Sequence, residues 1–442
     1  MMEPGNYLRN NNFIGENKMK TYKPDSAGVI YPYIKEHWNT QFRLEAELDA
    51  PVDEATVKKA LSDIRKRFPT YFVKLVKRGQ VYLLEEADSD NLVSEEGPQI
   101  FKDFDPEKEI PFRVLFFKNR LALEAYHILS DATGGLIFFK TLLGQYYHLL
   151  GKEIEYDSQT LCPLDEPTEE ETGDPFLNIY NKGNGNGGFS GGISSFSYQY
   201  CPKEPRTTLG VTILQIPFAE IRALAKQHNT TLGVYIAALY IYSFYLYDGK
   251  NQKRDIRISM PIDLRRRFDI QSMRNFSLSS TLGISPKKEN WTLEKIIETV
   301  GPQLQSQLGI DRFINEAYTN VSATNSKIFE LIPVPLKKFA FSLGADLMGE
   351  RLLASTFSNL GPADVPASIK ENVLSLRMLL GEDRIKQINL SSTTYNGNLE
   401  LIFTSRVENQ SVQNIMETLL KESGVNIKRI ERKVGSREYV PM

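Results

Sequence analysis

The segment 112–150 constrains the fold more than any other, because it predicts a β-hairpin that runs directly into a helix. Residues 112–117 and 121–127 show the apolar pattern of paired strands on either side of a Lys118-Asn119-Arg120 turn. Successive side chains point to opposite faces of a strand. One face of the second strand therefore carries Leu121, Leu123, Ala125 and His127. Because His127 ends this apolar stripe, we expect it to point inward.

A helix is predicted directly after this strand. Ser130 or Asp131 can cap it, because short polar side chains accept hydrogen bonds from the first free N–H groups of a helix. The apolar positions recur at helical spacing: Leu136, Phe139, Leu142, Leu143, Tyr146 and Leu150. His127 therefore stands at a strand-to-helix junction, with an aspartate four positions on and two glycines after it.

Strands and helices follow one another in mixed order along the rest of the chain. The strongest hairpin signal is Asn396-Gly397, between strands predicted over 387–394 and 399–405. Residues 40–48 alternate strictly, with charged side chains on one face, and predict a half-buried strand. Further strands are predicted over 71–77, 81–85, 208–216, 255–260, 353–359 and 373–379, and helices over 54–68, 218–228, 232–247 and 411–422. This mixed order predicts an α+β fold.

The chain changes character between Asp165 and Gly192. Acidic residues and a Gly/Asn run dominate there, a composition that cannot build a core. We predict four parts on this basis: a disordered or extended N-terminus over 1–18, an N-terminal lobe over 19–164, a linker or crossover over 165–205, and a C-terminal lobe over 206–442.

The bulk composition argues against several classes of function. The 53 basic and 55 acidic residues give a net charge of −2, which would not attract nucleic acid. The two cysteines form no C-x-x-C pair, so no metal site is predicted. The most apolar run, 232–247, is shorter than the roughly 20 residues of a membrane span, and the N-terminus lacks the apolar core of a signal peptide. We therefore expect a cytoplasmic protein without a membrane span.

His127 is a candidate general base, because histidine takes up and returns protons near neutral pH. Asp131 can fix its ring or brace the turn that carries it. The alternative is a structural histidine satisfied in the core, which is the commoner role of an isolated buried imidazole. His148, on the predicted helix, has no comparable neighbours, and we expect a structural role for it.

The pattern His127-x-x-x-Asp131 followed by glycine, after a strand and before a helix, resembles the active-site motif of the CoA-dependent acyltransferase superfamily. This superfamily includes chloramphenicol acetyltransferase, alcohol acetyltransferases, plant acyltransferases and peptide-synthetase condensation domains. Four further segments resemble it in order and rough spacing: Arg67-Phe68-Pro69, Pro261-Ile262-Asp263-Leu264-Arg265-Arg266, Arg274-Asn275-Phe276 and Ser358-Asn359-Leu360-Gly361-Pro362. The resemblance spans nearly the whole chain from about Met19.

Two positions depart from the motif of many condensation domains. Tyr126 stands where that motif has a first histidine, and Ala132-Thr133 separate Asp131 from its glycine, Gly134. Active acyltransferases of the superfamily also have a single histidine, so the first departure favours ester or amide formation over peptide condensation. The second concerns the local turn and leaves the base in place.

The resemblance implies an α+β fold of two chloramphenicol acetyltransferase-like lobes, each a mixed β-sheet with flanking helices, which meet at a central channel. It places His127 near the middle of that channel as the only catalytic base. It also implies that Asp131, with Gly134, is a structural element of the motif, and that Asp131 pairs with Arg265 or Arg266 of the second lobe. The residues implied for the oxyanion or the substrate channel are Asn275, Ser358 and Asn359, with Ser277 as a neighbour.

The function implied is transfer of an acyl group from acyl-CoA to an alcohol or amine, without an acyl-enzyme. Acyl-CoA would be a cosubstrate, and no permanently bound cofactor, metal or nucleic acid is expected. Two lobes in one chain imply a monomer. Two alternatives stay open: a condensation-like enzyme that takes its donor from an acyl carrier protein, and an inactive relative that binds or scaffolds.

Overall fold

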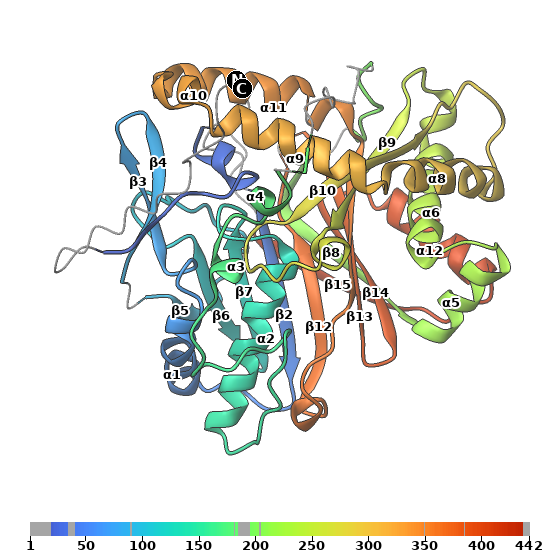
Figure 1. Cartoon of the computed structure of the whole chain (residues 1–442). Coiled ribbons are helices and arrows are strands. Elements are labelled where there is room, and N and C mark those ends of the chain that lie inside the picture. The colour runs from blue at the N-terminus through green and yellow to red at the C-terminus, as the bar shows by residue number, and fades with distance from the viewer. Residues whose placement is uncertain are drawn as a thin grey trace.

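The computed structural model describes residues 19–33, 40–88, 91–180, 182–183, 195–202, 205–348, 350–383 and 385–435. The N-terminal segment 1–18, expected to be disordered or extended, lies outside these ranges, as do residues 184–194 of the expected linker. Two mixed β-sheets form the centre of the protein, and helices cover them on the outside (Figure 1). The expected α+β fold with two lobes is confirmed.

The first lobe contains a five-stranded sheet in the order β12-β2-β7-β6-β5. Its pairs are antiparallel except for the parallel pair β5–β6. The strands are β2 (Gln41–Leu48), β5 (Val93–Glu95), β6 (Phe112–Phe117), β7 (Arg120–Tyr126) and β12 (Val373–Leu380). The lobe also contains helices α1 (Glu54–Ile64) and α2 (Ala132–Leu149), which pack against each other. Both helices begin at an aspartate whose side chain accepts a backbone N–H.

The second lobe contains a seven-stranded sheet in the order β10-β9-β11-β13-β14-β8-β15. Strand β11 is parallel to both of its neighbours, and the other pairs are antiparallel. The strands are β8 (Pro205–Pro217), β9 (Ile256–Asp263), β10 (Ser277–Ile284), β11 (Ser355–Pro362), β13 (Ile388–Tyr395), β14 (Asn398–Val407) and β15 (Lys428–Gly435). The predicted Asn396-Gly397 turn joins β13 to β14, with both residues at positive φ.

Helices cover the second sheet and extend over the top of the first lobe (Figure 1). They are α5 (Phe218–Gln227), α6 (Leu232–Tyr247), α7 (Arg265–Phe268), α8 (Leu293–Gln307), α9 (Ile310–Thr324), α10 (Lys327–Leu331), α11 (Val334–Met348) and α12 (Ser411–Glu422). Short 3₁₀ helices are η1 (Gly28–Tyr33), η2 (Arg65–Arg67), η3 (Gly249–Asn251), η4 (Glu350–Leu352) and η5 (Ala367–Ile369). A third, small sheet pairs β1 (Thr21–Tyr22), β4 (Val81–Glu86) and β3 (Val73–Arg78).

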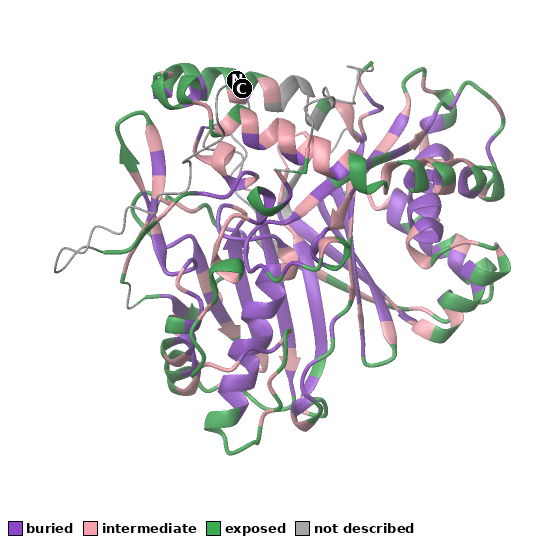
Figure 2. Ribbon diagram, viewed as in Figure 1, coloured by how far each residue is buried: buried purple, intermediate pink, exposed green. Residues whose placement is uncertain are grey.

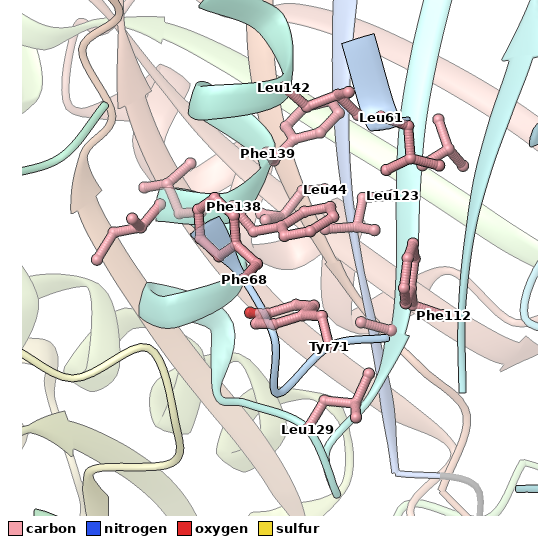
Figure 3. Packing of buried hydrophobic residues seen from close by; sticks show 14 of the residues in the cluster. Leu44, Leu61, Phe68, Tyr71, Phe112, Leu123, Leu129, Phe138, Phe139 and Leu142 are labelled. Carbon is pink, nitrogen blue, oxygen red and sulfur yellow. The ribbon is translucent and has the colours of Figure 1, made fainter. Parts of the chain in front are cut away.

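The core of the first lobe lies between its sheet and helix α2. Figure 3 shows aromatic side chains of α2 meeting those of the segment after α1, and the rings of Tyr71 and Phe138 stack at a centroid distance of 4.5 Å. Helix α2 is buried along most of its length (Figure 2). The sheet and helix on either side of His127 are therefore held by dense apolar packing, which limits movement at the junction.

Strand β12 crosses the expected boundary between the lobes. It belongs to the segment 206–442, which was expected to form the second lobe, yet it pairs with β2 in the first sheet. Sequence periodicity identifies a strand but not its partner, because edge strands of both sheets present the same free backbone groups. The C-terminal half of the chain therefore contributes strand β12 to the sheet of the first lobe.

The expected exposed face of β2 is buried, which corrects the half-buried prediction. Arg43 and Glu45 are 0% and 1% exposed. Arg43 pairs with Glu45 and Glu124, and Arg432 of β15 in the second lobe bonds to Glu45. The charged face of β2 therefore meets the other lobe in place of water, and each buried charge has an opposite partner.

The expected linker also contributes to the core. Helices α3 (Glu169–Thr172) and α4 (Pro175–Tyr180) form within it. Phe176 and Ile179 of α4 are buried with Phe276 and Phe313 of the second lobe. The sequence did not predict this contribution, because the average composition of the segment is acidic and rich in glycine. Two apolar residues on one face of a short helix hardly change that average.

Candidate active site

His127 lies in the turn directly after β7 and directly before the residues that begin α2. Its backbone N–H donates to the Thr40 carbonyl at 2.9 Å, which extends the pairing of β2 with β7 by one position. The ring centre lies 5.1 Å from that of Phe42 and 6.3 Å from that of Tyr31. His127 is half-buried, while Tyr126 and Ile128 on either side are buried. The predicted inward direction places its ring on the wall of a cavity.

This cavity has a volume of about 310 Å³ and is lined from both lobes. Five of the residues predicted for the site line it: His127, Asp131, Asn275, Ser358 and Asn359. Ser277 lines it too, whereas Gly134 and Arg265 lie behind the wall. A hollow of about 520 Å³ beside Tyr198 and Arg254 contains none of the candidate residues. The cavity at His127 is therefore where the motifs of both lobes converge.

Burial lowers the pKa of His127 below its ordinary value of 6.5, because an imidazolium is poorly solvated in this position. The charge of Asp131 and a hydrogen bond with Asn275 act in the opposite direction without reversing the shift. The ring is therefore neutral near pH 7, which is the form that accepts a proton.

Asp131 is directed toward the second lobe. Its carboxylate receives Arg265 at 2.9 and 3.0 Å, the Phe276 N–H at 2.8 Å, and the Gly134 N–H at 3.0 Å as the N-cap of α2. Burial raises the pKa of Asp131, but the charge and hydrogen bonds of Arg265, together with the Gly134 and Phe276 N–H groups, lower it below its ordinary value. Of the two arginines considered from the sequence, Arg265 makes the pair and Arg266 is exposed.

Every N–H group of the Arg265 guanidinium donates a hydrogen bond at this junction. Besides Asp131, it donates to Asp263 at 2.7 Å and to the carbonyls of Ser272 and Arg274 at 2.8 and 2.5 Å. An arginine has five N–H donors, and all five are engaged here. The pair is therefore a fully satisfied clamp between the loop after β7 and the loops around α7.

Gly134 is required by close packing at the start of α2. A Cβ atom at this position would overlap the Ser130 hydroxyl and the Met273 carbonyl oxygen. We expect Gly134→Ala to destabilise the protein by about 1–3 kcal/mol, because the overlap forces backbone movement. Denaturant unfolding of this variant measures the loss. Gly344→Ala, at a helical glycine with open space around its Cβ position, is the matched control and should be neutral or stabilising.

Asn275, just before β10, holds the loop of His127. Its side-chain nitrogen donates to the His127 carbonyl at 2.7 Å and to Asp25 at 2.9 Å, and its Oδ1 lies 3.4 Å from His127 Nδ1. Both amide N–H groups are thus engaged. This geometry favours a role in positioning His127 over the expected donation to an oxyanion.

Ser358 and Asn359 lie where β11 bulges against β13. The Asn359 Oδ1 accepts hydrogen bonds from the Gly361 N–H at 3.1 Å and the Ser392 hydroxyl at 2.9 Å. With its oxygen held there, the side-chain N–H groups are left to donate elsewhere. Ser277 begins β10 on the same side of the cavity. Hydroxyl and amide groups of the second lobe therefore share one cavity with the imidazole of the first.

Sequence analysis missed the N-terminal contribution to this site. Ala27 and Tyr31 of the segment 23–33 line the cavity, and Asp25 contacts Asn275. This segment has no periodicity, so no element was predicted there. One signal was present: Asp25 stands three residues before Gly28, the first residue of η1, and its Oδ1 accepts the N–H groups of Ala27 and Gly28.

In the described ranges, no group of three or more His, Cys, Asp and Glu side chains is arranged to hold a metal ion. In the same ranges no single helix is long and apolar enough to cross a membrane; only α5 and α6 taken together reach that length and composition, and they are bent by 83°.

Comparison with known proteins identifies the fold. No protein-family model and no curated protein sequence matches the chain. Solved structures do match it over nearly its full length. The trichothecene 15-O-acetyltransferase TRI3 from Fusarium sporotrichioides has a TM-score of 0.62 at 12% identity, covering 91% of this chain and 94% of its own. The chain has the fold of this acetyltransferase.

Condensation domains match this fold to a similar degree. The first condensation domain of the calcium-dependent antibiotic synthetase, solved with a substrate analogue, has a TM-score of 0.59 at 13% identity, covering 92% of this chain and 96% of its own. Polyketide synthase associated protein 5 from Mycobacterium tuberculosis has a TM-score of 0.60 at 14% identity, covering 91% and 96%. At these identities the likeness concerns the fold, and the resemblance seen in the sequence motifs is thereby confirmed at that level.

Proposed function

We propose that this protein is an acyltransferase that moves an acyl group from a CoA thioester to an alcohol or amine, with His127 as general base. The observation that carries the proposal is a half-buried imidazole with a lowered pKa on the wall of a cavity lined from both lobes. The Asp131 carboxylate is paired with Arg265 and caps the start of α2, so in this proposal His127 acts as the only base.

The chemistry proceeds in two steps. Neutral His127 accepts the proton of the acceptor as its oxygen or nitrogen forms a bond to the thioester carbonyl carbon. The resulting tetrahedral oxyanion collapses, the carbon–sulfur bond breaks, and the imidazolium protonates the leaving thiolate. Ser277, Ser358 and Asn359 are the proposed donors to the oxyanion, and one such donor accounts for about 10²–10³ in rate.

Thiol release tests this proposal. The protein is incubated with a panel of acyl-CoAs and of short alcohols and amines, and free thiol is measured with and without acceptor. Acceptor-dependent release by the wild type supports the proposal. A protein that releases no thiol with any donor, yet keeps binding ligands, would be the inactive binding relative instead.

A carrier-protein donor is the second candidate, because condensation domains match the fold as well as the acetyltransferase does. The same assay distinguishes the two. Turnover with an acylated carrier protein, together with none for any acyl-CoA, would replace the CoA donor in our proposal. Turnover with acyl-CoA alone would retain it.

The lowered pKa of His127 predicts the pH dependence of turnover. Only the neutral ring accepts a proton, so activity is retained at high pH and lost as the pH falls below the pKa of His127. We expect kcat/KM to reach half its plateau below pH 6.5. A profile measured between pH 5 and 9 checks this, and an acid limb centred above pH 7 would contradict it.

A further inference from the structure

The N-terminal strap, defined as residues 23–33, meets Arg274 and Asn275 of the second lobe through one fully buried carboxylate, that of Asp25. Asp25 is 0% exposed. Its Oδ1 accepts the N–H groups of Ala27 and Gly28 at 3.1 and 2.6 Å. Its Oδ2 accepts the Asn275 side chain at 2.9 Å and lies 3.5 Å from the Arg274 Nε. The two oxygens of Asp25 thus have separate partners, one in the strap and one in the second lobe.

The strap is packed closely against this loop. A Cβ at Gly28 would meet Asp25 Oδ1 at 3.1 Å, the Ile128 carbonyl at 3.3 Å and Asn275 Nδ2 at 3.5 Å. Arg274 also donates to the Lys23 carbonyl at 2.9 Å. Direct contacts therefore connect Asp25 to Asn275, and Asn275 to His127.

The chemistry of these contacts determines which way the Asn275 amide faces. Asp25 Oδ2 and the His127 carbonyl are both acceptors, so the group between them must be the NH₂ of Asn275. The amide oxygen then faces His127 Nδ1 at 3.4 Å. An acceptor opposite Nδ1 favours the tautomer with hydrogen on Nδ1, which leaves the Nε2 lone pair free to take a proton.

We infer that Asp25 is a positioning residue that holds the Asn275 amide in one orientation and thereby keeps His127 in the tautomer with Nε2 unprotonated. This inference rests on the proposed function for its consequence in rate, but the tautomer itself is independent of any activity. The segment that carries Asp25 lies outside every motif of the superfamily resemblance.

Asp25→Asn tests whether Asp25 orients the Asn275 amide or only holds the strap in place. The oxygen of the new amide would stay with the N–H groups of Ala27 and Gly28, so its NH₂ would face the NH₂ of Asn275. Two donors cannot bond, so the orientation found in the wild type is weakened. In the turned orientation the Asn275 oxygen would accept from the new NH₂ but oppose the His127 carbonyl, so only part of the population would turn over. In that part the Asn275 NH₂ would face His127 Nδ1 and favour hydrogen on Nε2, the form that cannot act as base. We expect kcat to fall in proportion to the Nε2–H population, with KM little changed.

The matched control is Asp174→Asn. Asp174 is a second acid at the strap, and it accepts the N–H and hydroxyl of Ser26 at 2.9 and 2.6 Å. Asn275 and His127 have no contact with it among the bonds of the described chain. This variant should loosen the strap as much as Asp25→Asn does, while leaving kcat and the tautomer unchanged.

The ring tautomer is read from the ¹⁵N shifts of His127, assigned with His127→Ala, at a pH above its pKa. Wild type and Asp174→Asn should show hydrogen on Nδ1, and Asp25→Asn should show a growing Nε2–H population. The charged and titratable groups around Asp25 are Arg274, Asp174, Tyr31 and His127.

The outcomes are distinct. Hydrogen on Nε2 in the wild type would overturn the inference, even if Asp25→Asn did not fold. An unchanged tautomer in folded Asp25→Asn, or an equal effect in Asp174→Asn, would also overturn it. If the wild type transfers no acyl group to any acceptor, the proposed function fails while the tautomer comparison still decides the role of Asp25.

Discussion

Replacing His127 with alanine is expected to lower kcat/KM for acyl transfer by about 10²–10⁴-fold, the typical contribution of a general base. In the proposed mechanism the imidazole is the proton acceptor in the cavity lined from both lobes, and Asp131 cannot replace it because its carboxylate is engaged with Arg265. Steady-state thiol release with saturating donor measures the loss. Folding should be little affected, because the ring is half-buried beside a cavity.

His148→Ala provides the matched control. His148 is exposed near the end of α2, the helix that begins just after the turn containing His127. It should retain wild-type turnover. A similar loss in both variants, or full activity in His127→Ala, would show that the chemistry does not depend on this imidazole.

Arg265→Met is expected to destabilise the protein by about 3–5 kcal/mol, because it leaves the buried carboxylate of Asp131 without its cation. The contact joins residues 134 positions apart, so the loss should also loosen the junction of the lobes. Denaturant unfolding measures the stability. Arg266→Met, at the exposed neighbouring arginine, should change it little.

A double variant tests whether the uncompensated charge is the cause. Asp131→Asn/Arg265→Met removes both charges and should recover part of the stability lost in Arg265→Met. Exchange of the two charges should recover less, because Asp131 also accepts the N–H groups of Gly134 and Phe276, which an arginine cannot do. A double variant no more stable than Arg265→Met would contradict this account.

Several elements could be predicted because their signals are local. The strand that ends at Tyr126, the cap at Asp131 and the helix after it follow from alternation, capping chemistry and helical spacing over adjacent residues. The Asn396-Gly397 turn follows from its need for positive φ. The same local reasoning assigned no element between 285 and 352, where α8 to α11 form.

The candidate site was predicted in part. The motif residues His127, Asn275, Ser358 and Asn359 do line one cavity. The hydrogen bonds of each of these side chains depend on residues far away in the chain. Asn275, for example, donates to Asp25, 250 positions away, so this N–H group is already hydrogen-bonded within the protein. A motif indicates which residue types are present, whereas hydrogen-bond partners across the lobes decide which groups are left to act.

The sequence alone determined the strand-to-helix junction at His127, the two-lobed α+β architecture and the residues that could carry chemistry. The tertiary structure decided that Arg265 and not Arg266 pairs with Asp131, that β12 joins the first sheet, and that Arg43 and Glu45 are buried. The physical reason is range. Alternation, caps and turns depend on neighbours in the chain, whereas charge pairing, sheet partners and burial depend on which surfaces the folded lobes bring together.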